Sequence, residues 1–177
     1  MSRPIDPFTF DLLRIISWNI EGLYKNLASE ETRNFILDSD LIGLSETWVT
    51  GTPPNLPGMS LIGHRKAKRS KTRGRASSGI CVYARSTAEF TVREIVLDDH
   101  SSENYIWVEL SASNNKVAIC FAYNPPSSSL FKNDDFFKSL SESLEETQLD
   151  MNVNYYSILG DFNARVGDLE DLSLIHI

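Results

Sequence analysis

The sequence lacks the features that mark membrane, secreted and zinc-binding proteins. No apolar run approaches the roughly 20 residues that span a bilayer, and residues 1–11 have no signal-peptide core. The only cysteines, Cys81 and Cys120, each lie inside an apolar run, which favours buried, reduced thiols over a disulfide framework. No pair of histidines or cysteines has transition-metal spacing. We therefore expect a nuclear or cytoplasmic protein that is not secreted and has no membrane partner.

Positive charge is scarce outside a single segment. The 177-residue chain has a formal net charge of −7, and seven of its seventeen Lys and Arg residues lie in residues 65–75. This basic segment contains Arg65, Lys66, Lys68, Arg69, Lys71, Arg73 and Arg75. Because lysine and arginine neutralise phosphates without reading base sequence, we expect the segment to contact a nucleic-acid backbone. A solvated loop and a nuclear-localisation patch are the alternatives.

Length and composition fit one soluble domain. Hydrophobic residues make up 41% of the chain and charged residues 23%, both ordinary values. We expect an N-terminal arm at residues 1–11, one domain at residues 12–171 and a separate tail at residues 172–177. The tail, LSLIHI, is typical of a translated sequencing adapter, so the natural reading frame would be cut near Asp171. The alternative is the start of an authentic strand.

The first third of the chain predicts a strand, a helix and a second strand. Residues 12–19 and 41–46 are apolar runs that predict strands buried on both faces. Residues 26–38 alternate apolar and charged side chains, which predicts a short helix. This order is the βαβ pattern of a parallel sheet. Residues 50–58, with three prolines and two glycines, predict a loop, and a short strand at 60–63 leads into the basic segment, which is expected to be a loop or hairpin tip.

The rest of the chain predicts an antiparallel meander, a helix and a last strand. Residues 79–85, 89–97, 105–110 and 117–123 are β-rich runs separated by polar turns. Residues 133–148 predict the clearest helix, capped by Asn133 or Asp134, with Phe136, Phe137, Leu140 and Leu144 as its apolar stripe. The run that starts at residue 155 predicts a final strand.

Polar side chains stand at the ends of several buried runs. They are Asn19, Glu46, Tyr123 with Asn124, and Asp161 with Asn163. In open α/β sheets, ligands collect beyond the carboxyl ends of strands, so these side chains could share one cleft. Two carboxylates with neutral oxygen ligands suit Mg²⁺. Singly, Asn19 is also typical of a turn, Glu46 of a solvated strand end and Tyr123 of a half-buried core aromatic; Gly-Asp-Phe-Asn at 160–163 also fits a turn, whose Gly160 permits a bend or a close approach.

Four of these stretches resemble the successive motifs of the endonuclease/exonuclease/phosphatase superfamily. They are Ile-Ser-Trp-Asn-Ile at 16–20, Leu-Ser-Glu-Thr-Trp at 44–48, Ala-Tyr-Asn-Pro-Pro at 122–126 and Gly-Asp-Phe-Asn at 160–163. The resemblance covers residues 12–167, with the motifs in family order. It is strongest to the apurinic-like endonuclease domain of non-LTR (LINE-type) retrotransposons, here truncated at the C-terminus.

The resemblance implies a fold, an activity and a set of roles. The fold is an α/β four-layer sandwich of two packed mixed sheets flanked by helices, with the second sheet incomplete. The activity is Mg²⁺-dependent phosphodiester hydrolysis, with Mn²⁺ as a possible substitute, which nicks DNA and leaves a 3′-hydroxyl to prime a reverse transcriptase encoded downstream. Glu46 would ligate the metal with support from Asn19. Asp161 would orient or deprotonate the attacking water, Asn163 would bind the phosphate or hold Asp161, and Tyr123 would hydrogen-bond the phosphate.

One family motif has no counterpart in this sequence. The family carries a C-terminal Ser-Asp-His, whereas the histidines here are His64, His100 and His176, none of them in that context. We therefore expect the 177-residue chain alone to be poorly soluble and weakly active or inactive, with apolar surface and an unpaired sheet edge exposed. The alternative functions are a phosphatase or lipid phosphodiesterase of the same superfamily and a non-catalytic nucleic-acid-binding remnant.

Overall fold

The computed structural model describes residues 13–70, 74, 76–86, 90–97, 102–112, 115–151, 153 and 155–164. The expected arm at residues 1–11 and the suspected adapter tail at residues 172–177 lie outside the described residues. Lys71, Arg73 and Arg75 of the basic segment, and the histidines His100 and His176, also lie outside them.

The described residues form two four-stranded sheets and a small hairpin. The first sheet has the order β1 (Ile15–Asn19), β2 (Leu41–Ser45), β6 (Ile80–Arg85), β3 (Met59–Arg65). The second has the order β10 (Tyr155–Asp161), β9 (Asn115–Tyr123), β8 (Tyr105–Ala112), β7 (Thr91–Ile95). The hairpin pairs β4 (Lys68–Arg69) with β5 (Ala76–Ser77). The helices are α1 (Leu23–Asn26), α2 (Glu30–Leu37) and α3 (Phe136–Met151).

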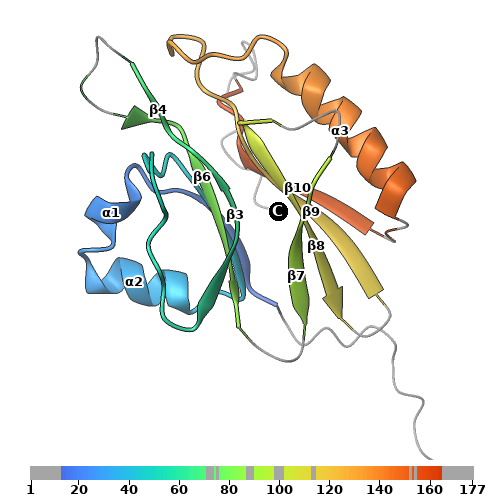
Figure 1. The fold of residues 1–177 in the computed structure, drawn as a ribbon, viewed down its shortest axis with the longest axis horizontal. Helices are drawn as coiled ribbons and strands as arrows, with labels where there is room; N and C mark the ends of the chain where they lie inside the picture. Colours follow the sequence, from blue (N-terminus) through green and yellow to red (C-terminus); the bar gives the residue numbers. More distant parts are fainter. Residues whose placement is uncertain are drawn as a thin grey trace, which may run out of the picture.

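These elements stack in four layers, as Figure 1 shows: α1 and α2 on one outer face, then the two sheets, then α3 on the other outer face. The core between the sheets contains Val82, Val108 and Phe121, all at most 2% exposed. The sheets approach so closely at Gly43 that a Cβ there would lie 2.0 Å from the ring of Phe121. The fold class predicted from the sequence, an α/β sandwich with mixed sheets, is confirmed.

Strand direction brings four strand ends to one place. β1 is parallel to β2, and β9 is parallel to β10, while the other pairings within the two sheets are antiparallel. Strands β1 and β10 lie next to each other across the two sheets, and so do β2 and β9. The carboxyl ends of β1, β2, β9 and β10 therefore meet at the same end of the sandwich, which is where the predicted site residues stand.

Most predicted elements are observed, with two corrections near the N-terminus. The expected helix at residues 26–38 is observed as the shorter α2, with α1 before it, because Ser29 starts α2 as its N-cap by accepting a hydrogen bond from the Thr32 N–H at 3.3 Å. The first strand was expected to be buried on both faces. Its residues are half-buried and Ser17 is exposed, because in the described part of the chain β1 pairs with β2 alone and is an edge strand.

The apolar stripe of α3 also differs from its prediction. Phe136 and Leu140 are buried as expected, but Phe137 is 56% exposed. The buried face continues instead through Ser143 and Thr147. Their hydroxyls donate to helix carbonyls at 2.8 Å, so these buried polar groups are hydrogen-bonded. Small hydroxyl residues at these positions let the helix lie close to the second sheet, where Trp107 donates to Ser143 at 3.0 Å.

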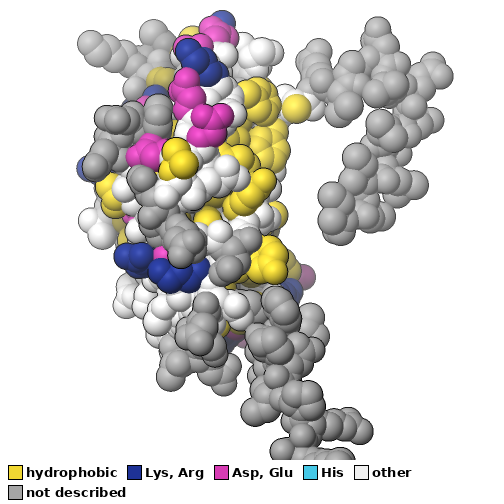
Figure 2. Space-filling model, turned by 90° about the vertical axis from the view of Figure 1, so that its right-hand side faces the viewer, with side chains coloured by type: hydrophobic (Ala, Val, Ile, Leu, Met, Phe, Trp, Pro, Cys, Tyr) yellow, Lys and Arg dark blue, Asp and Glu magenta, His cyan; other side chains and the backbone are white. Residues whose placement is uncertain are grey.

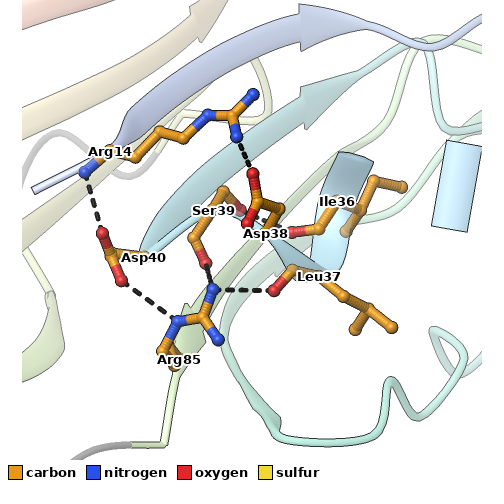
Figure 3. Close-up of polar contacts among 7 residues, drawn as sticks. All are labelled: Arg14, Ile36, Leu37, Asp38, Ser39, Asp40 and Arg85. Carbon is orange, nitrogen blue, oxygen red and sulfur yellow. Dashed lines mark hydrogen bonds and ion pairs between the residues drawn. The ribbon is translucent and has the colours of Figure 1, made fainter. Parts of the chain in front are cut away.

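The end of the first sheet opposite the site is closed by polar contacts (Figure 3). Arg85 donates to a carboxylate oxygen of Asp40 at 3.0 Å and to the carbonyls of Leu37 and Ser39. Asp40 also accepts the backbone N–H of Arg14 at 2.8 Å. The Arg85 guanidinium therefore joins the C-terminal end of α2 to the start of β2 and the end of β6. These contacts fix the position of the helix on the sheet.

Figure 2 looks onto the α3 side of the molecule and shows hydrophobic side chains gathered beside acidic ones. The large exposed hydrophobic residues of α3 and β10 are Phe137, Leu149, Tyr155 and Tyr156. These exposed side chains accord with the expected low solubility, which stays a prediction. In the described segments, no helix has the length and apolar character needed to cross a membrane.

Candidate active site

A cavity of about 370 Å³ opens where the four strand ends meet. It is lined by Asn19, Glu21, Glu46, Trp48, Ser77, Tyr123, Pro126, Ser128, Ser129, Asp161 and Asn163. Every residue predicted to be catalytic or metal-binding therefore lies on one cavity, although these residues are spread over most of the sequence. The first sheet contributes Asn19 and Glu46, and the second contributes Tyr123 and Asp161.

Two hydrogen bonds cross the cavity from one sheet to the other. The Asn19 side-chain amide donates from Nδ2 to Oδ2 of Asp161 at 2.9 Å. The Tyr123 hydroxyl donates to Oε1 of Glu46. The first bond joins the ends of β1 and β10, and the second joins β2 to β9. These pairs fix the relative position of the two sheets at the site.

The Glu46 carboxylate is held by donors on both of its oxygens. Oε2 accepts the indole N–H of Trp48 at 2.6 Å and the backbone N–H of Ser78 at 3.0 Å, while Oε1 accepts the Tyr123 hydroxyl. The carboxylate is half-buried at the mouth of the cavity. Charge-assisted hydrogen bonds of this kind orient an ionised carboxylate more firmly than water does.

Tyr123 is a buried hydrogen-bond donor. It is 3% exposed, and burial raises the pKa of its phenol well above the ordinary value, with further contributions from its bond to Glu46 and from the charges of Glu46 and Asp161. A phenol with so high a pKa remains protonated near neutrality and can donate its proton in a hydrogen bond. Its backbone is fixed by Asn104, whose carbonyl accepts the Tyr123 N–H at 2.8 Å.

The Asp161–Asn163 loop is tied to the end of β9. The backbone N–H of Asn163 donates to Oδ1 of Asp161 at 3.1 Å, and the Asn163 side chain donates to the carbonyl of Asn124 at 2.8 Å. Asn124 in turn donates to the carbonyl of Phe162 at 3.1 Å. Gly160 lies within β10, where a Cβ would be 2.0 Å from the carbonyl oxygen of Ala122, so glycine is needed for the close pairing of β9 and β10.

Unusual backbone conformations concentrate around this cavity. Among the described residues, the non-glycine residues with positive φ are Glu21 (48°), Glu46 (51°), Trp48 (57°), Ser78 (67°) and Asn163 (43°). All but Ser78 line the cavity, and Ser78 binds Glu46. Left-handed backbone at such residues is costly and is retained where surrounding contacts hold it, as at many functional sites.

Sequence reasoning did not assign roles to several residues that the structure places at the cavity. Ser77, Ser128 and Ser129 line its wall. Trp48 belongs to a motif that the sequence analysis identified, so its position was visible but not its contact with Glu46. Ser78 acts through its backbone N–H, which no side-chain pattern could reveal. His64 does not line the cavity; it lies on β3, where burial lowers its pKa.

The described part of the basic segment contains both paired and exposed side chains. Arg65 forms an ion pair with Glu94 at 2.8 Å. Lys68 pairs with Glu103 and lies 5.9 Å above the ring of Phe131. By contrast, Lys66 and Arg69 are exposed.

The hairpin that carries Lys68 and Arg69 lies beside the cavity. Ser77 of β5 lines the cavity, so the hairpin is adjacent to the cavity. Figure 1 shows the hairpin and the chain segment before α3 at the same end of the molecule.

The donor atoms at the cavity fit a hard divalent cation. Within the described residues, no three His, Cys, Asp or Glu side chains form a metal-binding group by themselves. The cavity instead offers the carboxylates of Glu46 and Asp161 and the side-chain oxygen of Asn19. Mg²⁺ is bound in this manner, through one or two carboxylates with water and substrate oxygens completing its shell. The absence of sulfur and imidazole from this set disfavours zinc.

No protein-family model matches the sequence, and no curated protein does either. Several solved structures match the fold. The endonuclease domain of TRAS1, a telomere-specific non-LTR retrotransposon, superposes with a TM-score of 0.53 at 14% identity, covering 87% of this chain and 62% of that domain. The catalytic domain of Xenopus laevis APE2 gives 0.59 at 18% identity, with 85% and 58% covered. The 3′ phosphatase NExo from Neisseria, bound to product DNA hairpin, gives 0.58 at 17% identity, with 89% and 60% covered.

The fold is therefore the one that these solved structures share, and it agrees with the fold implied by the resemblance of the four sequence motifs to the endonuclease/exonuclease/phosphatase superfamily. These neighbours include the endonuclease domain of a retrotransposon and a 3′ phosphatase. The chain spans about six tenths of the length of these solved domains.

Proposed function

We propose that this chain is part of a Mg²⁺-dependent DNA-nicking endonuclease domain of a retrotransposon polyprotein. The observation that carries the proposal is the pair of cross-sheet hydrogen bonds, Asn19 to Asp161 and Tyr123 to Glu46. They bring together the two carboxylates, the amide and the phenol that phosphodiester hydrolysis with a hard cation requires.

Each side chain has a distinct task in this proposal. A divalent cation, when bound, would offset the negative charge that develops on the phosphate oxygens. Glu46 and Asn19 would hold it, and Mn²⁺ could replace Mg²⁺ at such oxygen ligands. Asp161, oriented by the Asn19 amide and the Asn163 N–H, would position the attacking water and accept its proton. Tyr123 would donate to a phosphate oxygen, and Asn163 would bind the phosphate or hold Asp161.

DNA as substrate is supported by charge and by the neighbours. Arg69 is exposed on the hairpin, whose Ser77 lines the cavity, and Lys66 is exposed just before it; their charges would attract a phosphate backbone. One structural neighbour is bound to product DNA and another is a retrotransposon endonuclease domain. A reverse transcriptase domain would then follow in the same polyprotein. The protein would act in the nucleus or the cytoplasm.

The proposal is tested by nicking of supercoiled plasmid with protein in excess, so that weak activity is visible. We expect slow conversion to open circles with Mg²⁺ and none with a chelator. Glu46→Gln and Asp161→Asn should each lower the rate at least about 100-fold, because each removes a charge used in catalysis. Glu31→Gln, an exposed acid on α2, is the matched control and should leave the rate unchanged.

Other outcomes would favour the alternatives. Salt-sensitive DNA binding that Glu46→Gln and Asp161→Asn leave intact, without Mg²⁺-dependent cleavage, would identify a non-catalytic remnant. Without nicking, release of phosphate from small phosphomonoesters would identify a phosphatase, and release of a phosphomonoester from a phospholipid would identify a lipid phosphodiesterase.

A further inference from the structure

Trp48 contacts the Glu46 carboxylate from only two residues away. Its indole Nε1–H donates to Oε2 at 2.6 Å, which is short for a hydrogen bond from nitrogen. Both residues have left-handed backbone, with φ of 51° at Glu46 and 57° at Trp48. In an extended strand the side chains of residues two apart lie on the same face but do not come within hydrogen-bond distance in this way. The left-handed turn therefore brings the indole to the carboxylate.

The turn that carries this bond is held from both sides. The Gly22 N–H donates to the Glu46 carbonyl at 2.8 Å, and the Trp48 N–H donates to the Ser78 carbonyl at 3.1 Å. The indole also lies directly against Gly22, since a Cβ there would be 2.5 Å from its Cε3 atom. The indole therefore has a fitted place, and its N–H is aimed at Glu46.

The two oxygens of Glu46 consequently have different surroundings. Oε2 accepts two N–H groups, from Trp48 and from the Ser78 backbone. Oε1 accepts the Tyr123 hydroxyl and lies on the side of the second sheet. An oxygen with two N–H donors has little capacity left for a cation, whereas Oε1 has one donor that is free to turn toward a phosphate.

We propose that Trp48 is a positioning residue that anchors Oε2 of Glu46, so that the carboxylate offers a divalent cation Oε1 alone. This inference rests on the proposed function, because it assigns the cation to Glu46. The proposal gives the indole N–H a specific role. Packing of the aromatic ring alone would not need an N–H group. Donors that orient a metal-binding carboxylate commonly change metal affinity 10–100-fold when they are removed.

The first test reads the indole directly in the intact protein. The chain has three tryptophans, so a ¹⁵N-labelled sample gives three indole signals; Trp18→Phe and Trp107→Phe spectra assign two of them and leave the third to Trp48. We expect the Trp48 indole proton to resonate downfield, to exchange slowly and to shift on Mg²⁺ titration, with the downfield position lost in Glu46→Gln. The Trp18 indole should not respond to Mg²⁺. A Trp48 signal that Glu46→Gln leaves unchanged would overturn the proposal, even if Trp48→Phe failed to fold.

The second test measures Mg²⁺ affinity from amide shifts at the cavity. Trp48→Phe keeps an aromatic ring beside Gly22 and removes the N–H, so we expect about tenfold weaker binding with a similar Tm. Trp18→Phe is the matched control, because Trp18 packs on Phe35 and does not line the cavity; it should bind Mg²⁺ as the parent does. Equal affinity in Trp48→Phe and parent would refute the role of Trp48 alone. A parent that binds no Mg²⁺ would refute the proposed function and this inference with it.

Discussion

Tyr123 shows how one side chain serves both folding and chemistry. It is buried between the sheets, packs in the central core, and still places its hydroxyl on the Glu46 carboxylate at the cavity. The sequence left two interpretations of this residue open, a core aromatic and a phosphate ligand. The structure shows that its ring belongs to the core and its hydroxyl to the candidate site. The phosphate contact stays a prediction.

Tyr123→Phe separates the two roles. The ring and its packing are retained, while the donor to Glu46 and to the phosphate is lost, so we expect about 100-fold slower nicking with Tm within a few degrees of the parent. The control is Tyr24→Phe, which removes a hydroxyl that donates to the Thr52 carbonyl outside the cavity. Nicking rate and thermal unfolding of both variants check this. An unchanged nicking rate in Tyr123→Phe would remove the phenol from the mechanism.

At the scale of elements, an ion-pair group joins three adjacent strands of the second sheet, β7, β8 and β9. The Glu109 carboxylate on β8 accepts hydrogen bonds from Nε and Nη2 of Arg93 on β7, both at 3.0 Å. Its Oε2 atom also lies 3.4 Å from Nζ of Lys116 on β9. Ser111 also donates to the carboxylate at 2.9 Å. The bond to Arg93 chiefly, against the opposing effect of burial, lowers the pKa of Glu109 to about 2.

This lowered pKa predicts a pH dependence of stability. Because the folded-state pKa lies below the unfolded value of 4.5, Glu109 stabilises the fold above pH 4.5, and that contribution is lost as pH falls from 4.5 toward 2. We expect Glu109→Gln to lower Tm by roughly 3–6 °C at pH 7, with the difference from the parent narrowing below pH 4.5. Thermal unfolding between pH 7 and pH 3 measures this. Glu145→Gln, an exposed acid on α3, should show no such difference; a constant difference for Glu109→Gln at every pH would contradict the assignment.

The elements also show where sequence patterns sufficed and where they did not. The runs that became β2, β6, β8 and β9 were predictable because the strands lie in the interiors of their sheets and their residues are mostly buried. The buried face of α3 was predicted only in part, because it includes the polar residues Ser143 and Thr147. Their burial is possible because their hydroxyls hydrogen-bond to the helix backbone. Periodicity of apolar residues does not detect such positions. The exposed face of β1 depends on which strands pair with it, which local sequence does not specify.

At the scale of the whole molecule, the site exists because two separate parallel pairs end together. The pair β1–β2 carries Asn19 and Glu46, the pair β9–β10 carries Tyr123 and Asp161, and each pair alone holds half of the donors. The sequence predicted these residues from the strand ends and from family motifs. It could not predict the crossed bonding, Asn19 with Asp161 and Glu46 with Tyr123, or the strained turn at Trp48, because these depend on how the sheets face each other.

The central claim is that this junction of the two sheets holds a divalent cation through Glu46. Electron paramagnetic resonance of free Mn²⁺, titrated with the purified chain, counts bound ions without requiring catalysis. The account predicts one bound Mn²⁺ that Mg²⁺ displaces, at least tenfold weaker binding in Glu46→Gln, and unchanged binding in Glu31→Gln. Equal Mn²⁺ binding by the parent and Glu46→Gln would place the ion elsewhere and contradict the account.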